Sequence, residues 1–374
     1  MSRRAVGFVP VTGWIWLCSA MLMPSVAQSA SGQVKVIQVA PRATVKGAFT
    51  MGAKPVFDVG GIQDNPEDEF DHKNGYLRAV TLSDGGLAVI DRVKVRLFDA
   101  RGTQRAVVGA LGRGPNEFVE LNLHCRTRGD TVVVHDGNAR VSVISPAGKI
   151  VRQIPDAAKG QLGRNGCFDN GTVLLQKAGS GGTENPTVLV NVVDLNGMTV
   201  QSLGEAPRES YRARLRTPVH AFAQGAFVVV ADSRTNEIRQ LGDAARAVTY
   251  RLGDEIEKAP ANVQPSVTAA KGSTGPEIQY AASPSWPLYD QVLPGANGSL
   301  WIQSYKRDQT EPDVWVQMDV AGKLIGKLSI PKPPEPRRRL QVQEFTNDGV
   351  LVDYTDADGA THFQLFRLTL ATGR

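Results

Sequence analysis

A tight glycine turn followed by a short apolar stretch recurs six times after residue 75, and this repeat constrains the fold more than any other feature. The turns contain the glycines at 86, 129, 171, 225, 298 and 349. A second tight turn with a closing glycine follows in four of the units, at 99–102, 145–148, 194–197 and 319–322. Asp-Gly and Asn-Gly pairs supply the positive φ that tight β-hairpins require. Each unit is therefore predicted to be a four-stranded antiparallel meander.

The remaining question is how such meanders bury both of their apolar faces. Radial stacking of copies would do so, and the absence of amphipathic helical patterns between the predicted strands argues against a parallel α/β sheet. The last unit, at about 340–370, has room for three strands only. The segment 54–60 has the pattern of the missing fourth strand. We expect it to pair with the last unit and close the ring, which leaves no free edge.

Two further patterns resemble a known family. Residues 107–118, VVGALGRGPNEF, are similar to the G-x-G-P-x-E-F linker of six-bladed, NHL-like β-propellers in bacterial exported proteins. Residues 134–141 and 230–238 resemble the NHL strand turn, with Asp136 and Asp232 followed by an Asn. The resemblance covers most of 54–370 loosely and is specific in the first, second and fourth units. The fifth departs from it, because no such Asp follows Trp301 and Ile302.

This resemblance implies an all-β fold, a six-bladed β-propeller of four-stranded antiparallel blades that is closed by an N-terminal strand. The propeller domain would span 54–374. We interpret the repeated Asp and Asn residues as structural turn caps, since their side chains bond the backbone at tight turns.

The N-terminus has the pattern of an export signal. Arg3 and Arg4 precede an uncharged, largely apolar stretch from Val11 to Met23, and Ser25-Val26-Ala27 fits signal peptidase. We predict a signal peptide at 1–27 and a lead segment at 28–53. A retained membrane anchor is the alternative, but the stretch is short for a span of about 20 residues. The mature protein is expected in the periplasm or secreted, without a stable membrane span.

Charge and cysteines limit the partners and the compartment. Removing Arg3 and Arg4 lowers the formal net charge from +5 to +3, so nucleic acid is not an expected partner. Cys125 and Cys167 stand four residues before the turns of neighbouring units. Export permits a disulfide, which requires Cα atoms within about 7 Å. The sequence leaves a disulfide and two buried thiols equally open.

Loop lengths differ between the two predicted faces of the ring. The turns within the first and second hairpins are tight, whereas the other connections include nearly all the long loops, at 60–76, 156–166, 177–187, 204–217, 253–285, 304–313 and 331–340. Long loops in a compact domain usually carry function or are disordered. We therefore predict that a ligand or partner binds the long-loop face.

Basic and aromatic residues gather in three of these long loops, at 204–217, 304–313 and 331–340, with Trp286 just after a fourth. They are Arg208, Tyr211, Arg212, Arg214, Arg216, Trp286, Tyr305, Lys306, Arg307, Arg337 and Arg338. Arginine suits carboxylate, phosphate or sulfate, and aromatic rings suit sugars or peptides. The expected partner is a small anionic ligand or an envelope or extracellular protein. The alternative is a set of solvated loops whose arginines pair with Glu205, Glu209 and Glu335.

A second candidate site follows from counting five residues back from each turn. The count places His124, His220 and Glu344 at one level on alternate units. Two imidazoles and one carboxylate could hold a divalent metal, which would favour a metal-dependent hydrolase of the lactonase or lyase type with a channel site. No other cofactor is predicted.

Known catalytic signatures are missing from the sequence. It contains no G-x-S-x-G, H-E-x-x-H or P-loop. Whether the protein is an enzyme stays open, and we favour a non-enzymatic binding or interaction module. A sensor-like domain in an envelope assembly is a third possibility.

Overall fold

Antiparallel strands dominate the part of the chain that the computed structural model describes. This part comprises residues 34–61, 69–70, 77–127, 129–137, 140–154, 161–178, 187–207, 219–242, 247–257, 286–307, 311–331 and 340–371. The predicted signal peptide at 1–27 lies outside the described residues. The prediction of an all-β fold is confirmed.

Four sheets are meanders in which neighbours in sequence pair antiparallel, as the repeat predicts. The first consists of β4 (Leu77–Thr81), β5 (Leu87–Asp91), β6 (Lys94–Phe98) and β7 (Gln104–Val108). The second consists of β8 (Leu121–Arg126), β9 (Val132–Asp136), β10 (Val141–Ile144) and β11 (Ile150–Ile154). The third consists of β12 (Gln161–Cys167), β13 (Val173–Ala178), β14 (Thr187–Val193) and β15 (Thr199–Pro207). The fourth consists of β16 (Val219–Gln224), β17 (Phe227–Asp232), β18 (Glu237–Leu241) and β19 (Val248–Leu252).

The fifth sheet has nine strands and differs from the predicted arrangement of six separate meanders. It contains β20 (Tyr289–Pro294), β21 (Leu300–Ser304), β22 (Asp313–Met318), β23 (Leu324–Ile330), β24 (Leu340–Phe345), β25 (Gly349–Thr355) and β26 (Thr361–Ala371). It also contains β2 (Ala48–Met51) and β3 (Phe57–Gly60). Because β2 pairs parallel with β23 and antiparallel with β26, it joins the last two groups of strands into one sheet.

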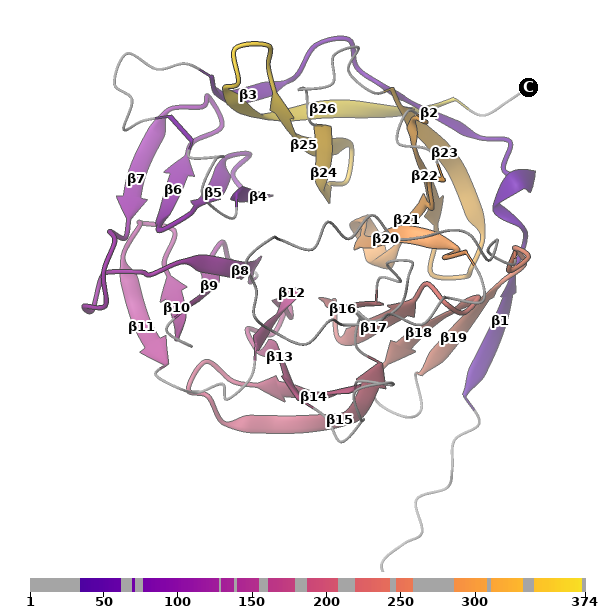
Figure 1. The fold of residues 1–374 in the computed structure, drawn as a ribbon, viewed down its shortest axis with the longest axis horizontal. Helices are drawn as coiled ribbons and strands as arrows, with labels where there is room; N and C mark the ends of the chain where they lie inside the picture. Colours follow the sequence, from indigo (N-terminus) through magenta and orange to yellow (C-terminus); the bar gives the residue numbers. More distant parts are fainter. Residues whose placement is uncertain are drawn as a thin grey trace, which may run out of the picture. The chain divides into compact units, whose positions relative to one another are not determined.

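Strand β3 occupies the place that the sequence predicts for the segment 54–60. It pairs antiparallel with β26, with Phe57 opposite Leu365 and Gly60 opposite His362. The backbone N–H of Val56 extends the ladder by donating to Leu365 O at 2.8 Å. The predicted pairing of this segment with the last unit is confirmed. The sheets surround a common centre, with β4, β8, β12, β16, β20 and β24 innermost (Figure 1).

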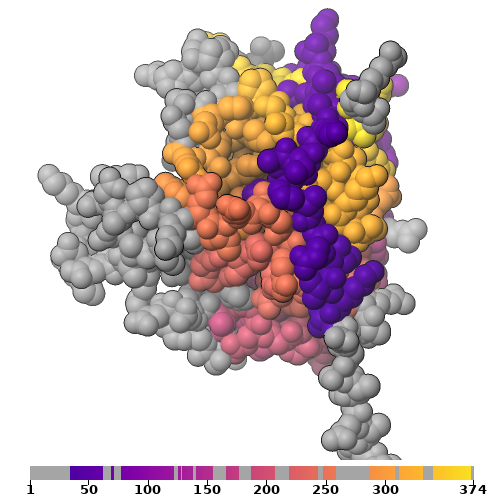
Figure 2. All heavy atoms as spheres, turned by 90° about the vertical axis from the view of Figure 1, so that its right-hand side faces the viewer, coloured from indigo at the N-terminus to yellow at the C-terminus, as the bar shows by residue number. Residues whose placement is uncertain are grey.

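The lead segment contains two strands to which the sequence analysis assigned no pairing. Strand β1 (Lys35–Val39) adds parallel to the outer edge of β19, and the short 3₁₀ turn η1 (Arg42–Thr44) connects it to β2. Arg42 secures this turn through an ion pair with Asp254 at 3.1 Å and a hydrogen bond to Leu288 O at 2.8 Å. Figure 2 shows the segment in indigo across the outside of the strands coloured orange and yellow.

The apolar core of the described residues is divided into six clusters, and each lies between neighbouring groups of strands. In one of them, Phe57 and Phe363 of the closing strands pack with Leu87 of the first sheet. Each neighbour thus covers an apolar face that a single meander would expose. Burial of this surface, worth about 25 cal/mol per Å², holds the sheets side by side.

An aspartate caps several of the tight turns. Asp99, Asp194, Asp319 and Asp356 each accept two backbone N–H groups, two and four residues further on, at 2.8–3.0 Å. The glycine that follows has positive φ, as at Gly102 with 81°. These side chains satisfy backbone donors that the turn would leave without partners.

The linker 107–118 fixes one sheet against the next. Its Phe118 is fully buried between the first two sheets, and Gly109 has φ of 101° and so little space that a Cβ would meet the Phe118 ring. Arg140 of the second sheet donates to the backbone O atoms of Gly114 and Glu117, and it pairs with the buried Asp136 at 2.8 Å. Asp136 therefore has a structural role, but the described contact that carries it is an ion pair with Arg140, where we expected a backbone cap.

Asp232 has a comparable role in the fourth sheet. Its Oδ1 accepts the backbone N–H of Arg234 at 3.0 Å, and its carboxylate pairs with the Arg234 guanidinium at 2.7 Å. The interpretation of the repeated Asp residues as turn caps is confirmed at Asp232, whereas the Asp136 carboxylate is engaged by the guanidinium of Arg140.

Candidate functional site

A cavity of about 930 Å³ lies where the inner strands meet the first tight turns of their units. Its polar lining includes Thr81, Ser83, Arg126, Asp169, Gln224, Gln343, Glu344 and Asp348. The turns at 223–227 and 294–298 form part of its rim. The cavity is therefore at the end of the ring opposite the predicted long-loop face, and the sequence analysis did not predict it.

Glu344 at the end of β24 is the central carboxylate of this cavity. Its Oε2 accepts the backbone N–H of Thr81 at 2.7 Å and the Thr81 hydroxyl at 2.9 Å. These bonds connect the last group of strands to the first. Burial raises the pKa of Glu344, and the Thr81 bonds and the charge of Arg126 oppose that shift only in part. The carboxyl group therefore retains its proton to a higher pH than an exposed glutamate.

Arg126 at the end of β8 is the one cation among the described lining residues. Its Nη1 donates to Oδ1 of Asp130 at 3.1 Å. Asp130 in turn accepts the backbone N–H and the hydroxyl of Ser83, at 2.9 and 2.5 Å. Arg126 stands next to Cys125, three residues before the second turn. Extending the alignment of the turns by one position would have found it.

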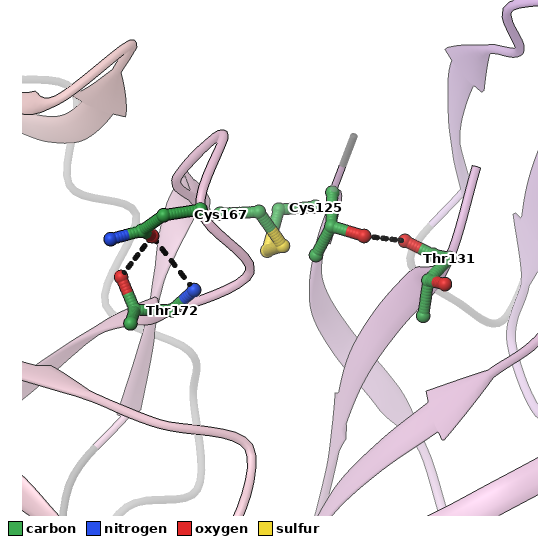
Figure 3. The surroundings of a disulfide bond; sticks show 6 residues. Cys125, Thr131, Cys167 and Thr172 are labelled. Carbon is green, nitrogen blue, oxygen red and sulfur yellow. Dashed lines mark hydrogen bonds between the residues drawn. A yellow bond between two sulfur atoms is a disulfide. The ribbon is translucent and has the colours of Figure 1, made fainter. Parts of the chain in front are cut away.

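A disulfide bond joins two inner strands in the wall of the cavity. Cys125 of β8 and Cys167 of β12 have Cα atoms 5.4 Å apart, within the limit that bridging requires. Figure 3 shows the two sulfur atoms between the strands, beside the turns that contain Thr131 and Thr172. The structure thus decides between the two alternatives that the sequence left open.

Other lining residues are fixed by bonds across the inner strands. Gln224 donates from Nε2 to Ser299 O at 2.5 Å. Gln343 donates from Nε2 to Oδ1 of Asp353 at 2.6 Å. Phe345 stacks on Trp301, with ring centroids 4.1 Å apart. The shape of the cavity is therefore set by side chains that are held in place without a ligand.

The described part of the predicted basic and aromatic sector lies at the other end of the ring. Trp286 precedes β20 and Tyr305 follows β21, and their ring centroids are 5.7 Å apart. The Arg307 guanidinium lies 5.4 Å from the centroid of the Trp286 ring. Arg307 also pairs with the carboxylate of Glu257, and the backbone O of Glu257 accepts the backbone N–H of Trp286 at 2.8 Å. Trp286, Tyr305 and Arg307 thus contact one another, and the cation of this cluster has a carboxylate partner.

Tyr305 is half-buried within this cluster. Burial and the nearby Asp290 raise the pKa of its phenol, and the charge of Arg307 opposes that shift. Lys306 points to a separate partner and pairs with Asp313 of β22. The remaining predicted residues, Arg208, Tyr211, Arg212, Arg214, Arg216, Arg337 and Arg338, lie outside the described residues.

The three hypothesised metal ligands are only partly described. Glu344 bonds Thr81, and Nε2 of His220 lies 3.0 Å from Asp290 O. His124 lies in β8, but its side chain is outside the described part. Among the described residues, no group of three His, Cys, Asp or Glu side chains is placed to hold a metal ion. Nor does any helix within the described ranges have the length and apolarity needed to cross a membrane.

Antiparallel meanders around a central cavity define a propeller-like all-β protein. No family model matches this chain, and no curated protein matches it. Among solved structures, it is similar to a Bacteroides fragilis protein whose name marks it as expected to be exported. The identity is 11% and the TM-score 0.55, over 91% of this chain and 100% of that one.

Two other solved structures are more distant. One is a member of the DUF4221 family from Bacteroides vulgatus, with 9% identity and a TM-score of 0.49 over 87% of this chain and 100% of that one. The other is a virginiamycin B lyase from Staphylococcus aureus, with 9% identity and a TM-score of 0.42 over the same shares. At these identities the likeness concerns the fold alone.

Proposed function

We propose that the mature chain is an exported six-bladed β-propeller that acts as a binding module. In this interpretation the nine-stranded sheet contains two blades, β20–β23 and β24–β26 with β3, which β2 joins. The six apolar clusters between neighbouring groups of strands support the count. The signal pattern at 1–27 and the disulfide support export, because disulfides persist in oxidising compartments.

We place the ligand on the long-loop face, and the cluster of Trp286, Tyr305 and Arg307 carries this proposal. A guanidinium over an indole face offers both a stacking surface and a fork of donors. Arg307 and its partner Glu257 are more than half exposed, so their pairing is weak and an anionic ligand can displace the carboxylate. The favoured ligand is a small or glycan-borne carboxylate or sulfate.

The alternative of a metal-dependent lactonase- or lyase-type hydrolase has no observation in its favour. His220 contacts a backbone carbonyl, and Glu344 bonds Thr81. A stoichiometric divalent ion in the purified protein, lost in His124→Ala, would support the enzyme instead. An ion that is absent, or unchanged in that variant, would dismiss these ligands.

A glycan array with carboxylated and sulfated members tests the binding proposal. The mature protein is expected to bind a subset of the acidic glycans, and Trp286→Ala and Arg307→Glu should each weaken that binding. Arg212→Glu and Arg338→Glu should do the same without lowering the melting temperature. Arg251→Glu is the matched control, because Arg251 pairs with Glu237 on the outer strands. Equal binding by the wild type and all four variants would refute the proposal.

A further inference from the structure

Two side chains of opposite charge line the cavity without pairing to each other. Glu344 uses Oε2 for both of its bonds to Thr81, and its Oε1 has no hydrogen-bond partner among the described residues. Arg126 forms an ion pair with Asp130 through Nη1 at 3.1 Å, and its buried Nε has no hydrogen-bond partner among the described residues. No ion pair connects Arg126 to Glu344 within the described ranges. The cavity therefore presents one carboxylate oxygen of Glu344 and the part of the Arg126 guanidinium that Asp130 does not engage.

The two charges are nevertheless close enough to interact. The charge of Arg126 lowers the pKa of Glu344, against the larger effect of burial. Glu344 is held on β24 by its contact with β4, and Arg126 is held on β8 by Asp130, which Ser83 of the first sheet fixes in turn. Both groups thus flank the same end of β4, and their separation is set by the fold. A bipolar ligand could bridge them.

We propose that this cavity binds a small zwitterion of the α-amino acid class, with its ammonium on Glu344 and its carboxylate on Arg126. The guanidinium fork matches a carboxylate, and a carboxylate is the natural partner of an ammonium. A volume of about 930 Å³ is ample for such a ligand. Ala79, Ala223 and Phe345 supply apolar wall for its side chain.

Other ligand charges fit this pair less well. A simple anion would meet the carboxylate of Glu344, and a simple cation would leave the guanidinium of Arg126 without a partner. Asp169 and Asp348 are exposed lining residues and add negative charge, which favours an ammonium over a second carboxylate. This site is separate from the one proposed on the long-loop face, at the opposite end of β20 and β21.

The test uses the mature protein and the twenty proteinogenic amino acids, one at a time, in thermal shift followed by titration calorimetry. A ligand that binds only the native state raises the melting temperature with its concentration. At least one amino acid is expected to do so. The affinity for its N-acetyl and C-amide derivatives should be lower by about tenfold or more, because each derivative lacks one charged contact.

Two conservative variants connect the binding to the named residues. Glu344→Gln keeps an acceptor for Thr81 and should weaken the amino acid about tenfold or more, and Arg126→Gln should have the same effect. Glu237→Gln and Arg251→Gln are the matched controls, because these two residues pair with each other on outer strands. If Arg126→Gln does not fold, the comparison of Glu344→Gln with Glu237→Gln still decides.

Three results would overturn the proposal. No response to any of the twenty amino acids would do so, as would equal binding of an amidated or acetylated form. Unchanged affinity in both cavity variants would place the ligand elsewhere. Trp286→Ala should leave amino-acid binding intact, so failure of this site and failure of the long-loop site can be distinguished.

Discussion

The two ends of the ring treat charged side chains in opposite ways. At the end with the tight turns, Arg126 pairs with Asp130, but Oε1 of Glu344 and Nε of Arg126 have no hydrogen-bond partner among the described residues. At the other end, Arg307 pairs with Glu257, and His362 lies between two carboxylates. The first arrangement destabilises the ligand-free protein slightly, and the second stabilises it. The comparison indicates where the fold has left groups available for a ligand.

The largest effect is expected from the disulfide at the cavity end. Cys125 and Cys167 are 42 residues apart, and a cross-link over a loop of this length contributes about 2–4 kcal/mol. Cys125→Ala combined with Cys167→Ala should lower the free energy of unfolding by that amount in urea titrations. Reduction of the wild type should have the same effect. If the midpoints do not change, the cavity end does not depend on this bond.

At the long-loop end, Arg140 is expected to have an effect almost as large. It pairs with Asp136, which is fully buried, and holds the linker through the O atoms of Gly114 and Glu117. Arg140→Ala removes the guanidinium that pairs with a buried carboxylate, which should lower the free energy of unfolding by about 1–3 kcal/mol. Urea unfolding measures the loss, and Arg140→Lys should recover part of it. A loss below about 1 kcal/mol would show that the linker does not need this pair.

Removing the charge of Glu344 from the cavity should raise the free energy of unfolding, whereas the two changes above should lower it. The folded protein holds the Glu344 proton above the ordinary pKa of 4.5, so this group's stabilising contribution is complete below that value. It is lost as pH rises through the raised folded pKa. At pH 7, Glu344→Gln should therefore raise the free energy of unfolding, by the order of 1 kcal/mol that is usual for single substitutions. Destabilisation by this variant would contradict the comparison.

The smallest effect concerns the histidine at the long-loop end. Hydrogen bonding to Asp58, 3.1 Å away, raises the pKa of His362 against burial, and Asp356 adds to the rise. Its contribution is complete below 6.5, the ordinary value, and is lost as pH rises through the raised folded pKa. It should be under about 1 kcal/mol, since the pair is partly exposed. His362→Gln should remove this pH dependence, and an unchanged profile would contradict the assignment.

The sequence predicted the parts of the fold that depend on local signals. Glycine turns with a preceding Asp mark the hairpins, and the pattern of 54–60 identified β3. The pairings of β1 and β2 escaped prediction because their partners, β19, β23 and β26, are remote in sequence. A four-residue strand such as β2 has no turn beside it to define a register, so its place depends on tertiary contacts alone.

For the cavity, the sequence predicted one lining residue, Glu344, but neither its contacts nor the role of Arg126. Counting back from the turns selected Glu344, which lines the cavity in the structure. It assigned Glu344 to a metal instead, because two histidines shared its position. The position of the Arg126 guanidinium could not be predicted, since it pairs with Asp130, which Ser83 of the first sheet holds in place. Counting from a glycine turn locates a residue along its strand, but the residues that it contacts depend on how the sheets are placed against one another.

The pairing of β26 with both β2 and β3 has a consequence for how the chain matures. Asp58 on β3 contacts His362, 304 residues later, so synthesis delivers the early strands long before their partners. Strand β2 meets its first native neighbour only when β23 is made, and β3 has to wait for β26, which pairs with both early strands. An interrupted chain lacks that strand, and its open edges would mark it for proteolysis. Complete native pairing of β2 and β3 therefore requires that β26 has been synthesised.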